Sequence, residues 1–286
     1  TAAMIRHTGM LSVVKGLPVL LALLLPAPAT RAGELPLFDA HLHYSAEDAA
    51  QYSAADILSI LDRNGVTRAV VTSTPPQQAL SLYRQAPARI VPFLGVYRQP
   101  DDKQDWHRDT NLPARVEEQL AAGPWAGIGE LHLFASERHS PVFRRLAELA
   151  EQHDLPLLLH GDPAVIDSLY EHTPGVTVIW AHGGTYPWPP LIRDYLQRYP
   201  KLHADLSVRD GRIAPDGVLD PAWTPLLLEF GDRLLIGVDT YSTRRWQQFD
   251  HVAGGIRHWL AQLPDEVAER IAHRNATSLF ATTGPR

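Results

Sequence analysis

Two histidines stand two residues apart at the end of a short apolar run. They are His41 and His43, and the run begins at Phe38. Successive side chains of a β-strand alternate between faces, so both imidazoles would point the same way, while Phe38, Ala40 and Leu42 would pack under helices. Two imidazoles at this spacing can share one divalent metal ion. Taken alone, the pair is explained as simply by two buried histidines with local hydrogen bonds.

Further histidines and carboxylates stand in or at the ends of other apolar runs. They are Glu130, His160, His182 and Asp239. Each would be costly to bury without a polar partner. One such residue would be ordinary, but six of them recur at the same place in the pattern. We therefore predict a metal site and treat all six residues as candidate ligands.

The runs that carry these residues alternate with amphipathic segments, which is typical of a parallel sheet built from strand–helix units. Eight strands are predicted, over 37–43, 68–73, 90–97, 127–134, 157–160, 176–182, 202–207 and 234–239. Eight such units in about 250 residues predict a single-domain α/β fold, the (β/α)8 TIM barrel. A barrel brings the carboxyl ends of its strands to one face, where the six residues would converge.

Composition narrows the chemistry further. The chain of 286 residues has a net charge of -6 and no cysteine. The acidic balance argues against nucleic acid as a partner, because phosphate backbones need clustered Lys and Arg. Without cysteine there are no thiol nucleophiles, disulfides or Cys-based zinc sites, so a metal must be held by His, Asp and Glu.

The N-terminus is predicted to be a signal peptide over 1–32. Arg6 and Lys15 precede an apolar run over 17–25, and small residues follow at the positions that a signal peptidase reads. The run is too short for a comfortable membrane span, although an uncleaved anchor is the alternative. We expect 33–286 to form the barrel domain, in a secreted or periplasmic protein with no stable membrane span after removal of the leader.

The stretches together resemble the amidohydrolase superfamily of metal-dependent hydrolases. The likeness is greatest to its amidohydrolase-related (amidohydrolase-2-like) branch, which also contains decarboxylases and lactonases. The matching stretches are FDAHLH at 38–43, GEL at 129–131, LH at 159–160, AHGG at 181–184, GVD at 237–239 and RNATSLF at 274–280. The resemblance covers the chain from Leu37 to Phe280.

The resemblance implies a ligand set. His41, His43 and Asp239 would hold one metal ion, and His160 and His182 a second. Glu130 would bridge them, where many members carry a carboxylated lysine. A single ion is the alternative, with His160 as a ligand and His182 free to polarise the substrate. Zinc is the expected metal, and manganese or iron would also suit these ligands.

The expected chemistry is hydrolysis of a small ester, lactone or amide. A metal ion lowers the pKa of a bound water to about 7, and a carboxylate beside it, here Asp239, can accept the proton during attack. The alternative reaction on the same site is non-oxidative decarboxylation of an aromatic or unsaturated carboxylic acid. A non-enzymatic binding barrel with a structural metal is the third hypothesis. The partner in the first two is a small-molecule substrate, and the oligomeric state is left open.

Other polar residues have two readings each. Arg98 and Arg209 follow the third and seventh strands, where they would either bind a substrate carboxylate or form salt bridges with loop acids. Asp205 would either support the site from behind or serve the barrel structurally. His132 shares the inward parity of Glu130 but lies beyond it, and Asn275 is expected to cap the last helix.

Overall fold

The computed structural model describes residues 35–281, and the expected signal peptide lies outside them. Eight parallel strands form one sheet in chain order. They are β1 (Leu37–His43), β2 (Val66–Thr72), β3 (Ile90–Leu94), β4 (Gly127–Leu133), β5 (Leu157–Gly161), β6 (Val178–Trp180), β7 (Leu202–Asp205) and β8 (Leu234–Leu235). Each strand pairs with the next through a parallel register, as βα units require.

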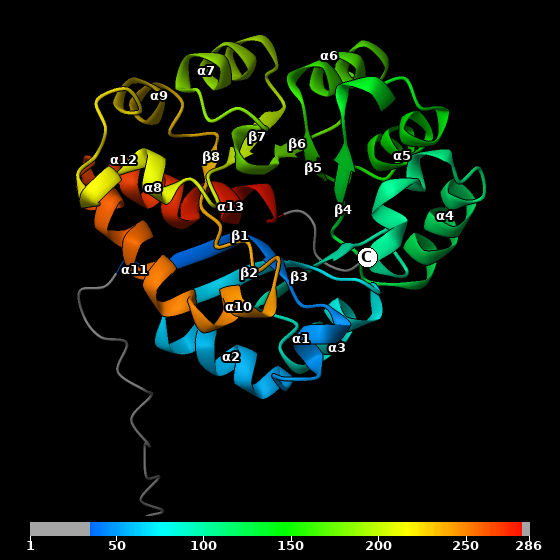
Figure 1. Ribbon diagram of the computed structural model, residues 1–286, viewed down its shortest axis with the longest axis horizontal. Helices are drawn as coiled ribbons and strands as arrows, with labels where there is room; N and C mark the ends of the chain where they lie inside the picture. The colour runs from blue at the N-terminus through cyan, green and yellow to red at the C-terminus, as the bar shows by residue number, and fades with distance from the viewer. Residues whose placement is uncertain (1–34, 282–286) are drawn as a thin grey trace, which may run out of the picture. The chain divides into compact units, whose positions relative to one another are not determined.

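The sheet closes on itself where the first strand meets the end of the last. The Ala40 amide donates to the Ile236 carbonyl at 2.9 Å, and the Asp239 amide donates to the His41 carbonyl at 2.8 Å. These bonds join β1 to the segment that follows β8. The predicted (β/α)8 TIM barrel is confirmed, with helices around the strands (Figure 1).

Helices follow the strands along the chain. The α-helices are α1 (Ala46–Ala49), α2 (Ala54–Arg63), α3 (Gln77–Gln85), α4 (Leu112–Ala122), α5 (Pro141–Gln152), α6 (Pro163–His172), α7 (Pro189–Arg198), α8 (Asp210–Ile213), α9 (Thr224–Glu229), α10 (Thr243–Gln247), α11 (Phe249–Leu260), α12 (Asp265–Glu269) and α13 (Asn275–Leu279). In α2, Ile57, Ile60 and Leu61 recur at helical spacing and are all buried. Ser53 caps this helix by accepting a hydrogen bond from the Asp56 amide at 3.2 Å.

The barrel interior differs from the expected pattern at β1. Phe38 and Ala40 were predicted to pack under helices, but they lie in a second core cluster that draws side chains from β2, β3, β5, β6 and β8. Phe38 stacks on Phe280 with ring centroids 5.6 Å apart. The register of β1 on β2 shifts between Asp39 and Leu42, so strict alternation is broken there. Leu42 does pack in the outer cluster, as expected.

The strands that carry His182 and Asp239 are shorter than predicted. β6 ends at Trp180 and β8 at Leu235, so both polar residues sit in the turns beyond the strands. His182 has φ 62° and Asp239 φ 53°, in the left-handed region. His182 and Asp239 therefore reach the site from turns, whereas the other four candidate ligands reach it from strands.

The C-terminal segment also differs from expectation. α12 runs through a π-helical turn (Arg270–Arg274) into α13, so Asn275 lies inside a continuous helical segment and does not cap it. Its side-chain amide donates to the carbonyls of Gly231 and Leu234 at 2.7 and 2.8 Å. Asn275 therefore ties this segment to the start of β8.

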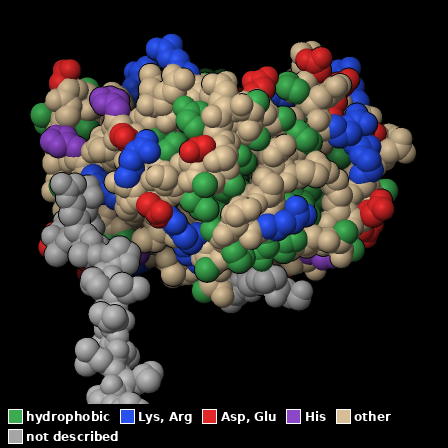
Figure 2. Space-filling view, turned by 90° about the horizontal axis from the view of Figure 1, so that it is seen from below, with side chains coloured by type: hydrophobic (Ala, Val, Ile, Leu, Met, Phe, Trp, Pro, Cys, Tyr) green, Lys and Arg blue, Asp and Glu red, His purple; other side chains and the backbone are tan. Residues whose placement is uncertain are grey.

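The surface carries mixed charge. On the face in Figure 2, basic and acidic side chains are interspersed with hydrophobic ones. Within residues 35–281, none of the helices has the length and apolar character needed to cross a bilayer.

Candidate metal centre

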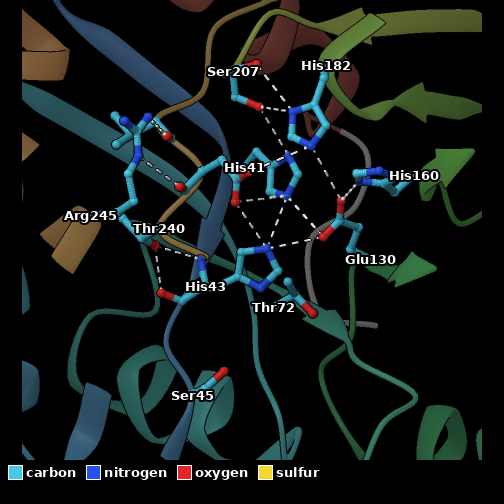
Figure 3. Close-up of polar contacts among 12 residues, drawn as sticks. His41, His43, Ser45, Thr72, Glu130, His160, His182, Ser207, Thr240 and Arg245 are labelled. Atoms are coloured by element: carbon cyan, nitrogen blue, oxygen red, sulfur yellow. Dashed lines mark hydrogen bonds and ion pairs between the residues drawn. The ribbon is translucent and has the colours of Figure 1, made fainter. Parts of the chain in front are cut away.

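The six predicted ligands come together at the carboxyl ends of the strands. Figure 3 shows five of them facing one another from β1, β4, β5 and the turn after β6. The sixth, Asp239 in the turn after β8, places its Oδ1 3.3 Å from His43 Nε2. Groups able to hold an ion include His41 with His43 and Glu130, and Glu130 with His160 and His182. The closed barrel thus brings together residues that lie far apart along the chain.

His41 and His43 form one corner of the cluster. Their Nε2 atoms are 3.2 Å apart, and that of His43 lies 3.3 Å from Asp239 Oδ1. Two nitrogens each about 2.0–2.1 Å from a tetrahedral zinc ion would lie roughly 3.4 Å apart. The spacing of the two imidazoles therefore fits a shared metal ion.

Glu130 lies between the two sets of histidines. Its Oε2 is 3.2 Å from His43 Nε2 and 3.5 Å from His41 Nε2, while its Oε1 is 3.1 Å from His160 Nδ1 and 3.8 Å from His182 Nε2. One carboxylate can give an oxygen to each side. This arrangement would serve one ion or two.

Asp239 is set in place by its backbone. Arg245 donates to the carbonyl of Val238 at 2.7 Å, and Thr240 Oγ1 bonds both the amide and the carbonyl of His43. The side chain of Asp239 is buried, and its Oδ1 has no hydrogen-bond partner among the described residues. A buried carboxylate oxygen without a hydrogen bond is what a metal ligand or a proton acceptor requires.

The charges of the cluster suit a divalent cation. Burial would raise the pKa of Glu130, but the facing imidazoles hold it well below its usual range. Burial would lower the pKa of His41, but Asp239, Glu130 and Asp205 raise it well above its usual range. Ionised carboxylates thus face imidazoles at close range, and a divalent cation would supply the positive charge in place of protons.

Two residues behind the cluster connect its histidines. Asp205 Oδ2 lies 3.0 Å from His41 Nδ1, and Ser207 Oγ lies 2.8 Å from His182 Nδ1. Burial would raise the pKa of Asp205, but His41 and the Ser207 hydroxyl lower it to about 2. Sequence reasoning left Asp205 between two readings and missed Ser207, whose only signal was its position at the end of the strand predicted over 202–207.

A second layer of polar residues borders Glu130 on its other side. His132 Nε2 is 3.4 Å from Glu130 Oε2, and its ring stacks on His160 with centroids 4.7 Å apart. The Tyr97 hydroxyl accepts from the His132 amide at 2.9 Å and lies 3.1 Å from His132 Nδ1. Burial lowers the pKa of His132 to about 3. Sequence reasoning missed Tyr97, whose only signal was its position at the end of the strand predicted over 90–97; the observed β3 ends at Leu94.

The two predicted substrate-binding arginines have protein partners. Arg98 is exposed and forms a salt bridge with Asp102, with its Nε 3.0 Å from Oδ2. Arg209 donates to the carbonyls of His182 and Gly184 at 3.0 and 2.7 Å. Arg98 still lines the cavity described next, whereas the structure places the Arg209 guanidinium against the backbone of the His182 turn.

A cavity of about 430 Å³ opens beside the cluster. His43 and Glu130 lie in its wall, together with Thr72, Tyr97 and Arg98. This volume is in the range of small-molecule sites. Two of the side chains that would hold a metal, His43 and Glu130, are therefore reachable from a space that suits a small substrate.

Comparison with known families decides the assignment. A family model described as amidohydrolase matches residues 38–282. The chain belongs to the amidohydrolase family. This confirms the resemblance predicted from the motifs. No curated protein matches the chain.

Solved structures share the amidohydrolase fold at low sequence identity. An uncharacterised TIM-barrel protein from Bordetella bronchiseptica is 15% identical, with a TM-score of 0.62 over 87% of this chain and 99% of its own. A probable 2-pyrone-4,6-dicarboxylic acid hydrolase from Acinetobacter baumannii is 18% identical, with a TM-score of 0.59 over 86% and 99%. A Burkholderia multivorans amidohydrolase with bound zinc is 14% identical, with a TM-score of 0.56 over 86% and 99%.

The amidohydrolase family is metal-dependent, and the site described above fits that requirement. Imidazole nitrogens and carboxylate oxygens are the donors that zinc, manganese and iron accept. The buried Asp239 Oδ1 without a hydrogen bond and the short Nε2–Nε2 distance of His41 and His43 both support a metal there.

Proposed function

We propose that this amidohydrolase cleaves a small ester, lactone or amide with the help of one or two divalent metal ions, most simply zinc. The observation that carries the proposal is the buried Asp239 carboxylate, whose Oδ1 lies 3.3 Å from His43 Nε2 and makes no hydrogen bond among the described residues. His43 and Glu130, next to it in the cluster, line the cavity. A bound metal would polarise the substrate carbonyl and lower the pKa of the attacking water.

The protein's own residues supply the rest of the chemistry. His41, His43, Glu130, His160, His182 and Asp239 are the residues that would hold the metal. Asp239 accepts a proton from the water while the oxygen of the water attacks the carbonyl carbon. Asp239 then gives this proton to the leaving oxygen or nitrogen as the bond between that atom and the carbonyl carbon breaks. His182 Nε2 lies 3.6 Å from Asp239 Oδ2, so these two donors would face the same ion.

We favour hydrolysis over decarboxylation because both candidate substrate-binding arginines already have partners within the protein. The decarboxylation hypothesis depended on Arg98 and Arg209 as anchors for an acid. Arg98 is neutralised by Asp102, and Arg209 is bonded to backbone carbonyls. Neither guanidinium stands free to orient a carboxylate over the metal ligands, whereas the Asp239 carboxylate is suitably placed for proton transfer.

The test combines metal content with turnover. Protein expressed with added zinc should hold at least one metal per chain and hydrolyse members of a panel of small esters, lactones and amides. Asp239→Asn should lower kcat by about 10²–10⁴-fold, the usual contribution of general acid–base catalysis, and retain most of the metal. Asp232→Asn, which alters an exposed carboxylate before β8, should leave turnover unchanged.

Two results would overturn the proposal. One is a metal content below about 0.3 per chain after supplementation, because the ligand set would then have no occupant. The other is release of carbon dioxide from an acid substrate without incorporation of labelled oxygen from water, which would establish decarboxylation instead.

A further inference from the structure

Two of the candidate ligands, on different strands, depend on one buried carboxylate. Asp205 ends β7 and Ser207 lies two residues further on, and neither is exposed. Figure 3 shows Ser207 beside the rings of His41 and His182, on the side away from Glu130. The proposed function assigns no role to either Asp205 or Ser207.

The hydrogen bonds at Asp205 leave no oxygen idle. Its Oδ2 lies 3.0 Å from His41 Nδ1. Its Oδ1 accepts from the Ser207 amide at 2.9 Å and from the Ser207 hydroxyl. An ionised carboxylate only accepts hydrogen bonds, so the proton between Asp205 and His41 belongs to Nδ1 of the imidazole.

The hydrogen bonds of Ser207 determine in the same way which nitrogen of His182 carries a proton. A serine hydroxyl has one proton, and that of Ser207 is donated to Asp205. Ser207 Oγ must therefore accept from His182 Nδ1, 2.8 Å away. The Ser207 carbonyl, 3.2 Å from the same nitrogen, is a second acceptor. His182 Nδ1 thus carries a proton as well.

With Nδ1 on the side of Asp205 and Ser207, the Nε2 atom of each ring faces the carboxylates of Glu130 and Asp239. His41 Nε2 lies 3.5 Å from Glu130 Oε2, and His182 Nε2 lies 3.6 Å from Asp239 Oδ2. The two rings stack with centroids 5.2 Å apart and planes 17° apart, so they are held in one orientation. With Nδ1 protonated, Nε2 of each neutral ring offers its lone pair to the ion.

We infer that Asp205 is a positioning residue that sets the ring orientation and tautomer of two metal ligands, of His41 directly and of His182 through Ser207. The inference rests on the metal-binding part of the proposed function. Asp205 is not itself a ligand for the same ion, since it lies on the Nδ1 side of His41 and its oxygens are occupied. Partners of this kind commonly change metal affinity by 10–100-fold.

Two variants separate the two branches of the network. Asp205→Asn would place an amide N–H against His41 Nδ1 if its oxygen keeps the Ser207 bonds, which would force the other tautomer on His41. Ser207→Ala would remove the hydroxyl that accepts from His182 and donates to Asp205 Oδ1, and would leave the bond between Asp205 Oδ2 and His41. Ser168→Ala is the matched control, because it removes a buried hydroxyl of α6 that bonds the Arg138 carbonyl, away from the site.

The experiment measures zinc affinity by competition with a chromophoric chelator, and the imidazole N–H protons by NMR of histidine-labelled protein with and without zinc. Asp205→Asn should weaken zinc binding about 10–100-fold and alter the Nδ1–H signals of both His41 and His182. Ser207→Ala should weaken it less, and alter the His182 signal more than the His41 signal, because Ser207 Oγ lies 2.8 Å from His182 Nδ1 and 3.4 Å from His41 Nδ1. Ser168→Ala should bind zinc within about twofold of wild type.

Results that would overturn the role of Asp205 can be told apart from results that would overturn the proposed hydrolysis. Zinc binding within about twofold of wild type in both variants would overturn the inference, as would equal disturbance of the His41 and His182 signals by Ser207→Ala. The N–H signals report on the network even in metal-free protein, so they decide the inference if hydrolysis is never found. If Asp205→Asn does not fold, the selective effect of the milder Ser207→Ala still decides it.

Discussion

At the scale of single residues, the site depends on backbone conformations that side chains must hold in place. His182, Val208 and Asp239 all have positive φ values between 53° and 62°. Such conformations cost of order 1 kcal/mol or more for a residue other than glycine, and they persist where the surroundings determine them. Arg209 bonds the turn at His182, and Arg245 bonds the turn at Asp239.

Arg209→Met should therefore act on the turn. It removes charged hydrogen bonds to the carbonyls of His182 and Gly184, so the free energy of unfolding should fall by roughly 1–3 kcal/mol and kcat should fall with it. Denaturant unfolding and steady-state kinetics measure both, and Arg212→Met, an exposed arginine of the same loop, is the control. Unchanged stability with a raised KM for carboxylate substrates alone would return Arg209 to substrate binding.

At the scale of elements, the barrel is held shut by bonds between its first and last parts. Thr240 joins the turn after β8 to His43, and the amides of Ala40 and Asp239 close the ladder. The helical segment that contains Asn275 packs against the same junction from the other end, with Phe280 on Phe38. Closure thus depends on residues far apart in the sequence.

Asn275→Ala should weaken this closure. The change leaves the carbonyls of Gly231 and Leu234 without their donor, which costs roughly 1–3 kcal/mol when such groups are partly buried. Equilibrium denaturation measures the loss, with Ser278→Ala, on the exposed side of α13, as the control. A loss no larger than that of the control would show that the last helices are held by apolar packing alone.

At the scale of the whole molecule, metal binding and folding should be linked. The ligands come from β1, β4, β5 and the turns after β6 and β8, and they are assembled only in the folded barrel. Zinc at 100 times its Kd should therefore stabilise the protein by about 2.7 kcal/mol, and a chelator should lower Tm. Thermal unfolding with and without chelator measures this, and His43→Ala should show a much smaller shift. If a chelator leaves the Tm of metal-loaded protein unchanged, metal binding and folding are not linked.

The stability of the barrel should also depend on pH through His203 in β7. Burial and the charge of Arg233 lower its pKa to about 4. The unfolded value is about 6.5, so the unfolded chain binds more protons between these values, and stability falls as pH drops from about 6.5 to about 4. This contribution is fully present above pH 6.5.

His203→Gln should remove that part of the pH dependence. The Tm of the variant minus that of wild type should rise as pH is lowered from 7 to 4.5, because only the wild type loses stability by protonating this group. Thermal melts across the range test it, with His153→Gln, an exposed histidine, as the control. A constant difference in Tm across the range would refute the role of His203.

The sequence by itself determined the barrel and the identity of the clustered histidines and carboxylates. Alternation of apolar runs with amphipathic segments predicted eight βα units, because each helix must cover the strand it follows. Polar residues such as His41 and Asp239 stood out where apolar side chains would otherwise be expected, since burial of a polar group needs a partner. Both signals depend on residues close together in the sequence, so they can be recognised without the tertiary structure.

Only the tertiary structure decided what lies around those ligands. The register shift in β1 sent Phe38 into the barrel interior, and the partners of Arg209 proved to be backbone carbonyls. Asp205 and Ser207 gained their places behind His41 and His182 because β7 closes next to β6 and β8. Hydrogen-bond partners across strands depend on register and closure, and neither of these is written in the spacing of residues along one chain segment.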